Sequence, residues 1–159
     1  MLRAVYPGTF DPVSSGHIDL MRRGTTLFDE VIVAVALNEN KAPTFNIDER
    51  VGFIEDATKD FGNIRAVAFD GLLVDFLEQV DARIILKGLR AVSDFEYELQ
   101  MSSINRRLSS KVETVLMMPS EKYSFVSSTV IREIAMLGGD VSSIAPANVV
   151  KALKIRYSK

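Results

Sequence analysis

The sequence lacks several features that would point to particular classes of protein. None of its 159 residues is cysteine, which excludes disulfides and thiolate metal sites and fits a reducing cytoplasm. No apolar run approaches the roughly 18–20 residues that span a bilayer, and no charged segment with a long apolar stretch after it suggests a signal peptide. Cations are not in excess, because the formal net charge is −2. Proteins that bind nucleic acid through its backbone usually carry a broad basic surface, so we expect neither a nucleic-acid partner nor a membrane.

The residues that are present alternate between strand-like and helical patterns. A continuous apolar run at residues 31–37 predicts a strand that is buried on both faces. Shorter strands are expected at residues 4–6, 64–69, 83–86 and 112–118. Helical patterns separate them at residues 17–28, 48–60, 73–79, 94–108 and 128–137, and a C-terminal helix is expected at about 146–156. This alternation predicts a single domain of residues 1–159 with an α/β fold, built on a doubly wound, five-stranded parallel sheet.

Ligands of such sheets bind beyond the carboxyl ends of the strands, where the strand order reverses. After the first strand the chain reads Tyr6-Pro7-Gly8-Thr9-Phe10-Asp11-Pro12, and the next helix begins near Gly16-His17. The glycines permit close backbone approach, and the N–H groups at a helix start attract anions. The only histidine, His17, can donate a hydrogen bond to a phosphate there. A lone histidine at a helix start is more often structural. The two glycines and the threonine in the same turn nevertheless favour phosphate binding.

Three further polar groups follow predicted strands. Residues 38–41, which end in Lys41, follow the second strand, and Lys87-Gly88-Leu89-Arg90 follows the fourth. The segment that begins at Tyr123 and includes Ser127-Ser128-Thr129 follows the fifth. Taken alone, Lys41 would be a solvated lysine and the serines a helix cap. The cations, hydroxyls and glycines of all four groups suit phosphate oxygens, and their convergence on one sheet edge favours a nucleotide site.

No His, Asp or Glu cluster has the spacing of a metal site that the protein itself holds. We therefore expect no protein-bound metal, and any divalent cation would arrive with a polyphosphate.

At this point the sequence resembles a known family. The segments 6–12 and 16–17, the segment Gly88-Leu89-Arg90-Ala91-Val92-Ser93-Asp94-Phe95-Glu96-Tyr97-Glu98 and the segment 127–132 together look like those of bacterial phosphopantetheine adenylyltransferases. These enzymes belong to the nucleotidyltransferases that share a T/HxGH motif and an ISSTxxR-like motif. The first motif indicates only the superfamily, whereas the segment 88–98 narrows the resemblance to this member. It extends from about residue 3 to about residue 155 and implies a Rossmann-like nucleotidyltransferase fold.

The resemblance also implies an activity and roles for individual residues. The reaction is adenylyl transfer from ATP to 4′-phosphopantetheine, which gives dephospho-coenzyme A and pyrophosphate in a late step of coenzyme A biosynthesis. His17 stabilises the transition state at the α-phosphate. The residues implied to bind phosphopantetheine are Thr9, Lys41, Leu73 and Lys87. Those implied to contact ATP are Thr9, Phe10, His17, Gly88, Leu89, Arg90, Glu98, Tyr123, Ser124, Phe125, Val126, Ser127, Ser128 and Thr129.

Several further expectations follow from the resemblance. They are Mg²⁺ carried with ATP, a cytoplasmic homohexamer, and feedback inhibition by coenzyme A. Three positions depart from the family pattern: Ser14 stands where the motif usually has Thr or His, Lys87 where Arg is common, and Val126 where Ile is usual. A lysine cannot grip a phosphate in the bidentate way of arginine, so Lys87 bears on substrate affinity more than on reaction type.

Three other kinds of function fit some of these sequence features. The same His17 loop could adenylylate nicotinate mononucleotide or cytidylylate a sugar or glycerol phosphate. A non-catalytic nucleotide-binding regulator would use the same sheet, although binding alone would not require His17, Lys41, Arg90 and the serine run together. A flavodoxin-like electron carrier shares only the fold class.

Overall fold

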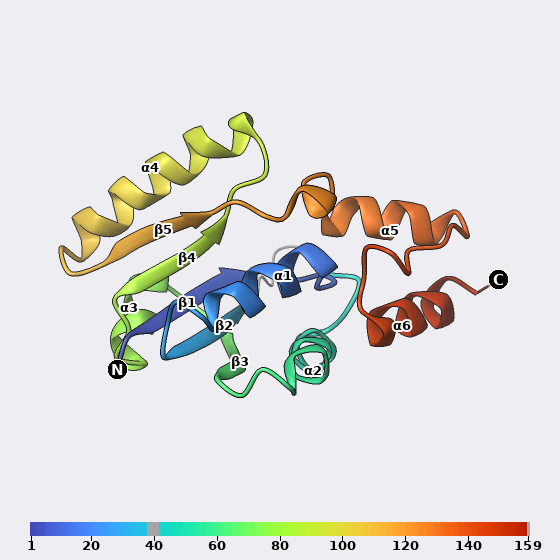
Figure 1. The fold of residues 1–159 in the computed structure, drawn as a ribbon, viewed down its shortest axis with the longest axis horizontal. Coiled ribbons are helices and arrows are strands. Elements are labelled where there is room, and N and C mark those ends of the chain that lie inside the picture. The colour runs from blue at the N-terminus through green and yellow to red at the C-terminus, as the bar shows by residue number, and fades with distance from the viewer. Residues whose placement is uncertain (38–41, 159) are drawn as a thin grey trace.

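The computed structural model describes residues 1–37 and 42–158, which form one five-stranded sheet with helices on both faces (Figure 1). The strands are β1 (Arg3–Gly8), β2 (Glu30–Ala36), β3 (Ile64–Phe69), β4 (Ile84–Gly88) and β5 (Glu113–Met117). The helices are α1 (Ser15–Gly24), α2 (Ile47–Thr58), α3 (Leu73–Gln79), α4 (Val92–Leu108), α5 (Ser128–Met136) and α6 (Ala147–Tyr157), with a 3₁₀ turn, η1, at Glu121–Tyr123.

The strands lie in the order β3-β2-β1-β4-β5, and every neighbouring pair is parallel. The expected doubly wound parallel sheet is therefore confirmed. The chain first builds outward from β1 to β3 and then returns to place β4 on the other side of β1. The strand order thus reverses between β1 and β4, and the crevice beyond their carboxyl ends is where such folds bind ligands.

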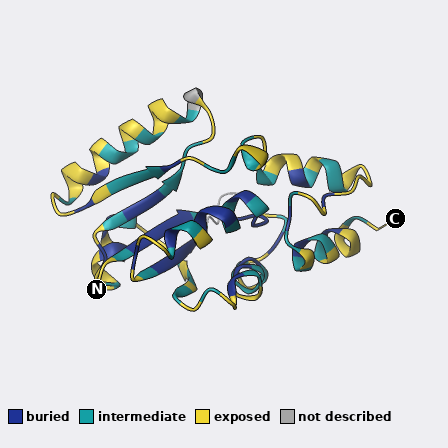
Figure 2. Ribbon diagram, viewed as in Figure 1, coloured by how far each residue is buried: buried dark blue, intermediate teal, exposed yellow. Residues whose placement is uncertain are grey.

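The apolar character of the central strands follows from their burial on two faces. Ala4 and Tyr6 of β1 face a core cluster with Leu20 and Met21 of α1, whereas Val5 faces a second cluster with Leu77 of α3. Successive side chains of a strand point to opposite faces, so a strand covered on both sides must be apolar throughout. The dark central strands of Figure 2 show this burial, and the run at residues 31–37 has the same cause.

The helix boundaries differ from the sequence expectation at both ends of the chain. Helix α1 begins at Ser15 rather than His17 and ends at Gly24 rather than Phe28. Its last residue, Gly24, lies close to β2 and β4, where a Cβ would be 3.3 Å from Leu86 and Val31. At the other end of the chain, Pro146 precedes the first turn of α6 as its N-cap instead of lying inside it.

Other local expectations are confirmed. The Asn46–Glu49 capping box opens α2, and Gly138, with a φ of 82°, follows the end of α5. The turn η1 was not expected. No helix in the described ranges is both long enough and apolar enough to cross a bilayer.

A buried arginine ties α2 to the ends of the first two strands. The Arg50 side chain is 1% exposed. Its Nη1 donates to the carbonyl oxygen of Thr9 at 2.8 Å and to that of Ala36 at 2.9 Å. The carbonyl groups at a strand's end have no further ladder partner, so a guanidinium with several donors satisfies both at once.

We therefore expect Arg50→Met to lower the free energy of unfolding by about 3 kcal/mol. The substitution removes the charged donor and leaves two partly buried carbonyl groups without a hydrogen-bond partner. Urea denaturation followed by circular dichroism measures this change. The matched control is Arg65→Met, which removes an exposed ion pair with Glu30 and should cost less than about 1 kcal/mol. Equal losses in the two variants would contradict this role for Arg50.

Candidate active site

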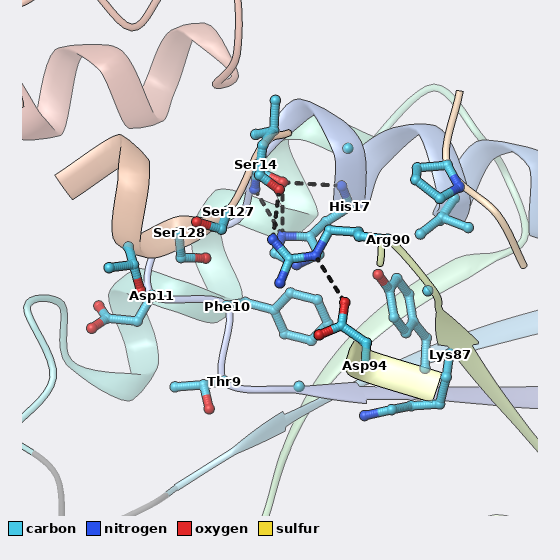
Figure 3. A pocket seen from close by; sticks show the side chains of 18 of the residues that line it. Thr9, Phe10, Asp11, Ser14, His17, Lys87, Arg90, Asp94, Ser127 and Ser128 are labelled. Atoms are coloured by element: carbon cyan, nitrogen blue, oxygen red, sulfur yellow. Dashed lines mark hydrogen bonds and ion pairs between the residues drawn. The ribbon is translucent and has the colours of Figure 1, made fainter. Parts of the chain in front are cut away.

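A cavity of about 700 Å³ opens beyond the carboxyl ends of β1 and β4, where the strand order reverses. Its walls come from five parts of the chain: the loop after β1, the start of α1, residues 42–44, the segment from the end of β4 into α4, and the segment 119–132. Figure 3 shows the side chains that project around it. Three of the four groups that follow a strand in the sequence contribute to these walls, and the fourth, residues 38–41, lies outside the described residues.

The loop after β1 is shaped by Phe10. Its φ is +48°, a left-handed conformation that non-glycine residues seldom adopt, and its ring is buried. The ring lies edge-to-face with Tyr6 at 5.3 Å and with His17 at 5.0 Å between centroids. It also covers Gly8, where a Cβ would lie 2.9 Å from the ring. Phe10 thus fixes the distance between the end of β1 and His17.

His17 lies in the first turn of α1, and Ser14 caps that helix. The Ser14 Oγ accepts the backbone N–H of His17 at 3.1 Å, while the Ser14 backbone N–H donates to the His17 Nδ1 at 3.0 Å. The imidazole faces the cavity and is partly buried. Burial, together with the nearby cations Arg90 and Lys87, lowers the pKa of His17 from 6.5 to about 4. The imidazole is therefore neutral at physiological pH.

The end of β4 supplies the two cations. Lys87 pairs with Glu98 of α4, its Nζ lying 3.5 Å from the Oε1. Arg90 donates from Nη1 to the carbonyl oxygen of Val126 at 2.9 Å, and its Nε lies 3.9 Å from an Asp94 oxygen. Between them, Gly88 leaves no room for a side chain, because a Cβ there would lie 2.6 Å from Leu20.

The segment before α5 uses its hydroxyls to hold the loops together. The Ser127 Oγ caps α5 by accepting the Val130 N–H, and the Ser128 Oγ donates to the carbonyl oxygen of Pro12 at 2.7 Å. Arg132 donates to the carbonyl oxygen of Asp11. The first N–H groups of a helix have no partner within it, so the backbone of α5, more than the Ser128 hydroxyl, offers donors to an anion.

In the described ranges, no three His, Cys, Asp or Glu side chains come together in a way that could hold a metal ion.

Comparisons with known proteins identify the family. The cytidylyltransferase-like family model matches residues 5–134. The phosphopantetheine adenylyltransferase of Thioalkalivibrio sulfidiphilus is 53% identical over 153 residues, which cover 96% of each chain. That of Legionella pneumophila strain Lens is 51% identical over 99% of this chain and 92% of its own. The chain belongs to the phosphopantetheine adenylyltransferase family.

Solved structures that resemble this member of the phosphopantetheine adenylyltransferase family support its fold. One, from Vibrio parahaemolyticus and named as a nicotinate-nucleotide adenylyltransferase, has a TM-score of 0.72 at 18% identity, over 96% of this chain and 99% of its own. A lipopolysaccharide core biosynthesis protein of Thermoplasma volcanium has a TM-score of 0.53 at 24% identity, over 76% and 97%. At such identities the likeness concerns the fold alone.

This cavity is lined by most of the residues that the resemblance to the phosphopantetheine adenylyltransferases implicates. They are Thr9, Phe10, His17, Lys87, Gly88, Arg90, Glu98, Tyr123, Val126, Ser127, Ser128 and Thr129. Four do not line it: Leu73, Leu89, Ser124 and Phe125. Leu73, the first residue of α3, packs against the core cluster that contains Val5 and Leu77. Phe125 is 87% exposed. Lys41 lies outside the described residues.

The cavity also has lining residues that the sequence analysis did not select as site residues. Tyr6, Asp11, Ser14, Asp94, Tyr97 and Arg132 are among them. Asp11 is buried and accepts the N–H groups of Thr44 and Phe45, so it holds residues 44–45 against the first loop. Tyr6, Asp11 and Arg132 lie inside the family's own motifs. Asp94 and Tyr97 lie inside the segment 88–98 that carries the resemblance, and Asp94 also lies one helical turn before Glu98, which places these two carboxylates on the same face of α4.

Proposed function

We infer that this protein transfers the adenylyl group of ATP to 4′-phosphopantetheine, which gives dephospho-coenzyme A and pyrophosphate in a late step of coenzyme A biosynthesis. Family membership supports the choice of substrates. The observation that supports the chemistry is the cavity at the reversal of strand order, where a neutral histidine, two cations and the start of a helix face one space. Its donors are neutral or cationic, as a site for two phosphorylated substrates requires.

The reaction needs alignment more than it needs a base. An oxygen of the phosphopantetheine phosphate forms a bond to the α-phosphorus of ATP, and the bond from that phosphorus to the bridging oxygen of the β-phosphate breaks. Pyrophosphate leaves with the electron pair. A phosphate monoester has its second pKa near 6, so the nucleophile is already largely dianionic at neutral pH. The site must therefore bring two anions together and stabilise the charge that develops.

We assign the residues accordingly. His17 would donate from Nε2 to an α-phosphoryl oxygen. Lys87 and Thr9, with Lys41, would hold the phosphopantetheine phosphate, and Leu73 would contact its arm beyond the cavity lining. The residues assigned to ATP are Thr9, Phe10, His17, Gly88, Leu89, Arg90, Glu98, Tyr123, Ser124, Phe125, Val126, Ser127, Ser128 and Thr129. The N–H groups at the start of α5 would face the β- and γ-phosphates.

Magnesium would enter with ATP, because Mg²⁺ is commonly held by phosphate oxygens and water with few protein ligands. The donors around the cavity fit this arrangement, since the Asp11 carboxylate is already occupied by two backbone N–H groups. When bound, the ion neutralises charge on the triphosphate.

Pyrophosphate release from an acceptor panel tests this function. With Mg²⁺, we expect ATP and 4′-phosphopantetheine to release pyrophosphate at least about 100-fold faster than ATP with nicotinate mononucleotide or CTP with glycerol phosphate, because pocket hydrogen bonds discriminate strongly. Preference for another acceptor would show that the protein has a related nucleotidyltransferase activity instead. Tight ATP binding with no release from any acceptor would indicate a regulator instead.

The matched variant for this assay is His17→Ala. By analogy with the loss of one oxyanion donor, the barrier should rise by roughly 3–4 kcal/mol. That change lowers kcat by about 100- to 1,000-fold. ATP binding by calorimetry and the circular dichroism spectrum should stay close to those of the unchanged protein. Near-normal turnover of the variant would show that His17 does not stabilise the transition state.

Lys87→Arg tests the departure from the family pattern. Lys87 already lies 3.5 Å from the Glu98 carboxylate, so a cation of either shape is accommodated beside α4. A guanidinium adds a bidentate grip on phosphate, so we expect kcat to be kept and the KM for phosphopantetheine to stay equal or fall. Lys87→Gln is the control and should raise that KM, because it removes the charge. A large loss of kcat in Lys87→Arg would show that the local geometry demands lysine.

We also propose that the protein works as a homohexamer in the cytoplasm, where ATP is made, and that coenzyme A inhibits it. Exposed apolar side chains on α4 support oligomerisation: Phe95 and Leu99, and on the other side of the helix Ile104 and Leu108, are each about half exposed, and the helix is largely yellow in Figure 2. Pairs of large apolar side chains left exposed on one helix favour contact with another chain.

Sedimentation equilibrium should therefore give a mass near six times that of the 17.6 kDa chain. Leu99→Glu should lower that mass, because it buries a charge in the interface. Gln100→Glu, at a neighbouring exposed position, is the control and should leave it unchanged. A monomeric unchanged protein would refute the proposal.

A further inference from the structure

We propose that Ser14 is a positioning residue that holds His17 as the neutral tautomer with its proton on Nε2, so that the histidine acts as a fixed donor and never as a titrating acid. The catalytic consequence rests on the proposed function. The tautomer itself does not, because the fold alone determines it.

The backbone of Ser14 decides which ring nitrogen carries the proton. Its N–H donates to the His17 Nδ1 at 3.0 Å. A backbone N–H can only donate, so Nδ1 must accept and cannot carry a proton itself. The single proton of a neutral imidazole therefore lies on Nε2.

The side chain of Ser14 reinforces this choice. Its Oγ accepts the His17 backbone N–H at 3.1 Å and lies 3.0 Å from Nδ1. Because the oxygen is already an acceptor, its own proton is free to point at Nδ1. Ser14 is 2% exposed, so water does not compete for these bonds. Protonation of Nδ1 would set a second donor against the backbone N–H and would lose the bond from the hydroxyl.

The opposite edge of the ring is open to the substrates. Across the described part of the chain, no buried side-chain nitrogen or oxygen lacks a hydrogen-bond partner. The Nε2 has no such partner there, so it must reach the cavity that His17 lines. The ring cannot turn easily, because Phe10 lies edge-on at 5.0 Å between centroids (Figure 3). The Tyr6 ring lies at 6.3 Å between centroids.

The charges around the ring act in the same direction. Lys87 and Arg90 face it from the end of β4, and their carboxylate neighbours, Glu98 and Asp94, come from α4. From the first loop and α5, Asp11 and Arg132 line the same cavity, while Tyr6 from β1 has a pKa that burial raises and so stays neutral. Burial and the two β4 cations disfavour an imidazolium, which keeps the pKa of His17 near 4.

The only histidine in the chain makes the tautomer directly observable. In protein labelled with ¹⁵N on histidine, long-range ¹H–¹⁵N spectra give one pair of ring signals. We expect a protonated Nε2 and an unprotonated Nδ1 from pH 8 to about pH 5.5, because each unit above a pKa of 4 leaves tenfold less imidazolium. A proton on Nδ1, or an imidazolium at pH 7, would overturn the proposal whatever the protein's activity.

Ser14→Ala separates the hydroxyl from the backbone. The variant keeps the N–H but loses the Oγ, so the tautomer persists while the unprotonated Nδ1 loses one hydrogen bond, and the pKa of His17 should rise. The ¹⁵N titration and the acid limb of kcat should both move to higher pH, and kcat at neutral pH should fall about tenfold, the effect of one lost hydrogen bond. The KM for ATP should change much less. Ser14→Thr, which restores the hydroxyl, should recover both readouts.

Asn46→Ala is the matched control. It breaks a capping box of the same design at the start of α2, so it should lower the melting temperature about as much as Ser14→Ala. It should leave the histidine titration and kcat unchanged. If Asn46→Ala changed them as Ser14→Ala does, or if Ser14→Ala changed neither, Ser14 would be only a helix cap. Lack of pyrophosphate release with the expected spectra would instead refute the proposed function and leave the tautomer standing.

Discussion

The whole site depends on the reversal of strand order between β1 and β4. Because a crossover between parallel strands is right-handed, a chain that builds in one direction from β1 and then in the other places its helices on opposite faces. The loops that leave β1 and β4 must therefore diverge, and a crevice opens between them. Into this crevice the first loop brings Thr9 and His17, and the end of β4 brings Lys87 and Arg90.

Polar loops such as those around the cavity cannot be held by apolar packing alone, and here polar side chains hold them. Arg50 satisfies the carbonyl groups of Thr9 and Ala36, and Ser128 satisfies that of Pro12. Asp19 accepts the Ser120 hydroxyl at 2.7 Å and so anchors the segment after β5 to α1. Burial by itself would raise the pKa of Asp19, but hydrogen bonds from Ser120 and two arginines hold it below its usual range. Each tether leaves the cavity-facing donors free.

The cations of the site have carboxylate partners before any substrate binds. Lys87 lies beside Glu98, and Arg90 beside Asp94, at 3.5 Å and 3.9 Å. These are loose pairs, so exchanging a carboxylate for a phosphate costs little, and the pairs keep unbalanced positive charge from accumulating in the empty site. The same cations oppose protonation of His17. Charge placement in the crevice thus bears on both substrate binding and the state of the histidine.

Local sequence patterns are enough to predict the fold class, the helices and strands within a few residues, and the polar groups that follow the strands. Those features depend on local periodicity, turn chemistry and motifs, which are written along the chain. The sequence also placed His17 in a phosphate loop, but only as one of several readings until the family resemblance joined it to Arg90 and Ser128.

Which atoms come into contact depends on how distant parts of the chain pack together. That Arg50 is buried under Thr9, that Asp11 fastens residues 44–45, and that Leu73 and Phe125 lie outside the cavity lining depend on contacts between residues far apart in the chain. The close packing of Gly24 against β2 and β4 also depends on tertiary structure. The protonation of His17 depends on three elements at once: the Ser14 backbone, the cations of β4 and the ring of Phe10. Periodicity in the sequence contains no such information, because a pKa is set by everything that surrounds a group in space.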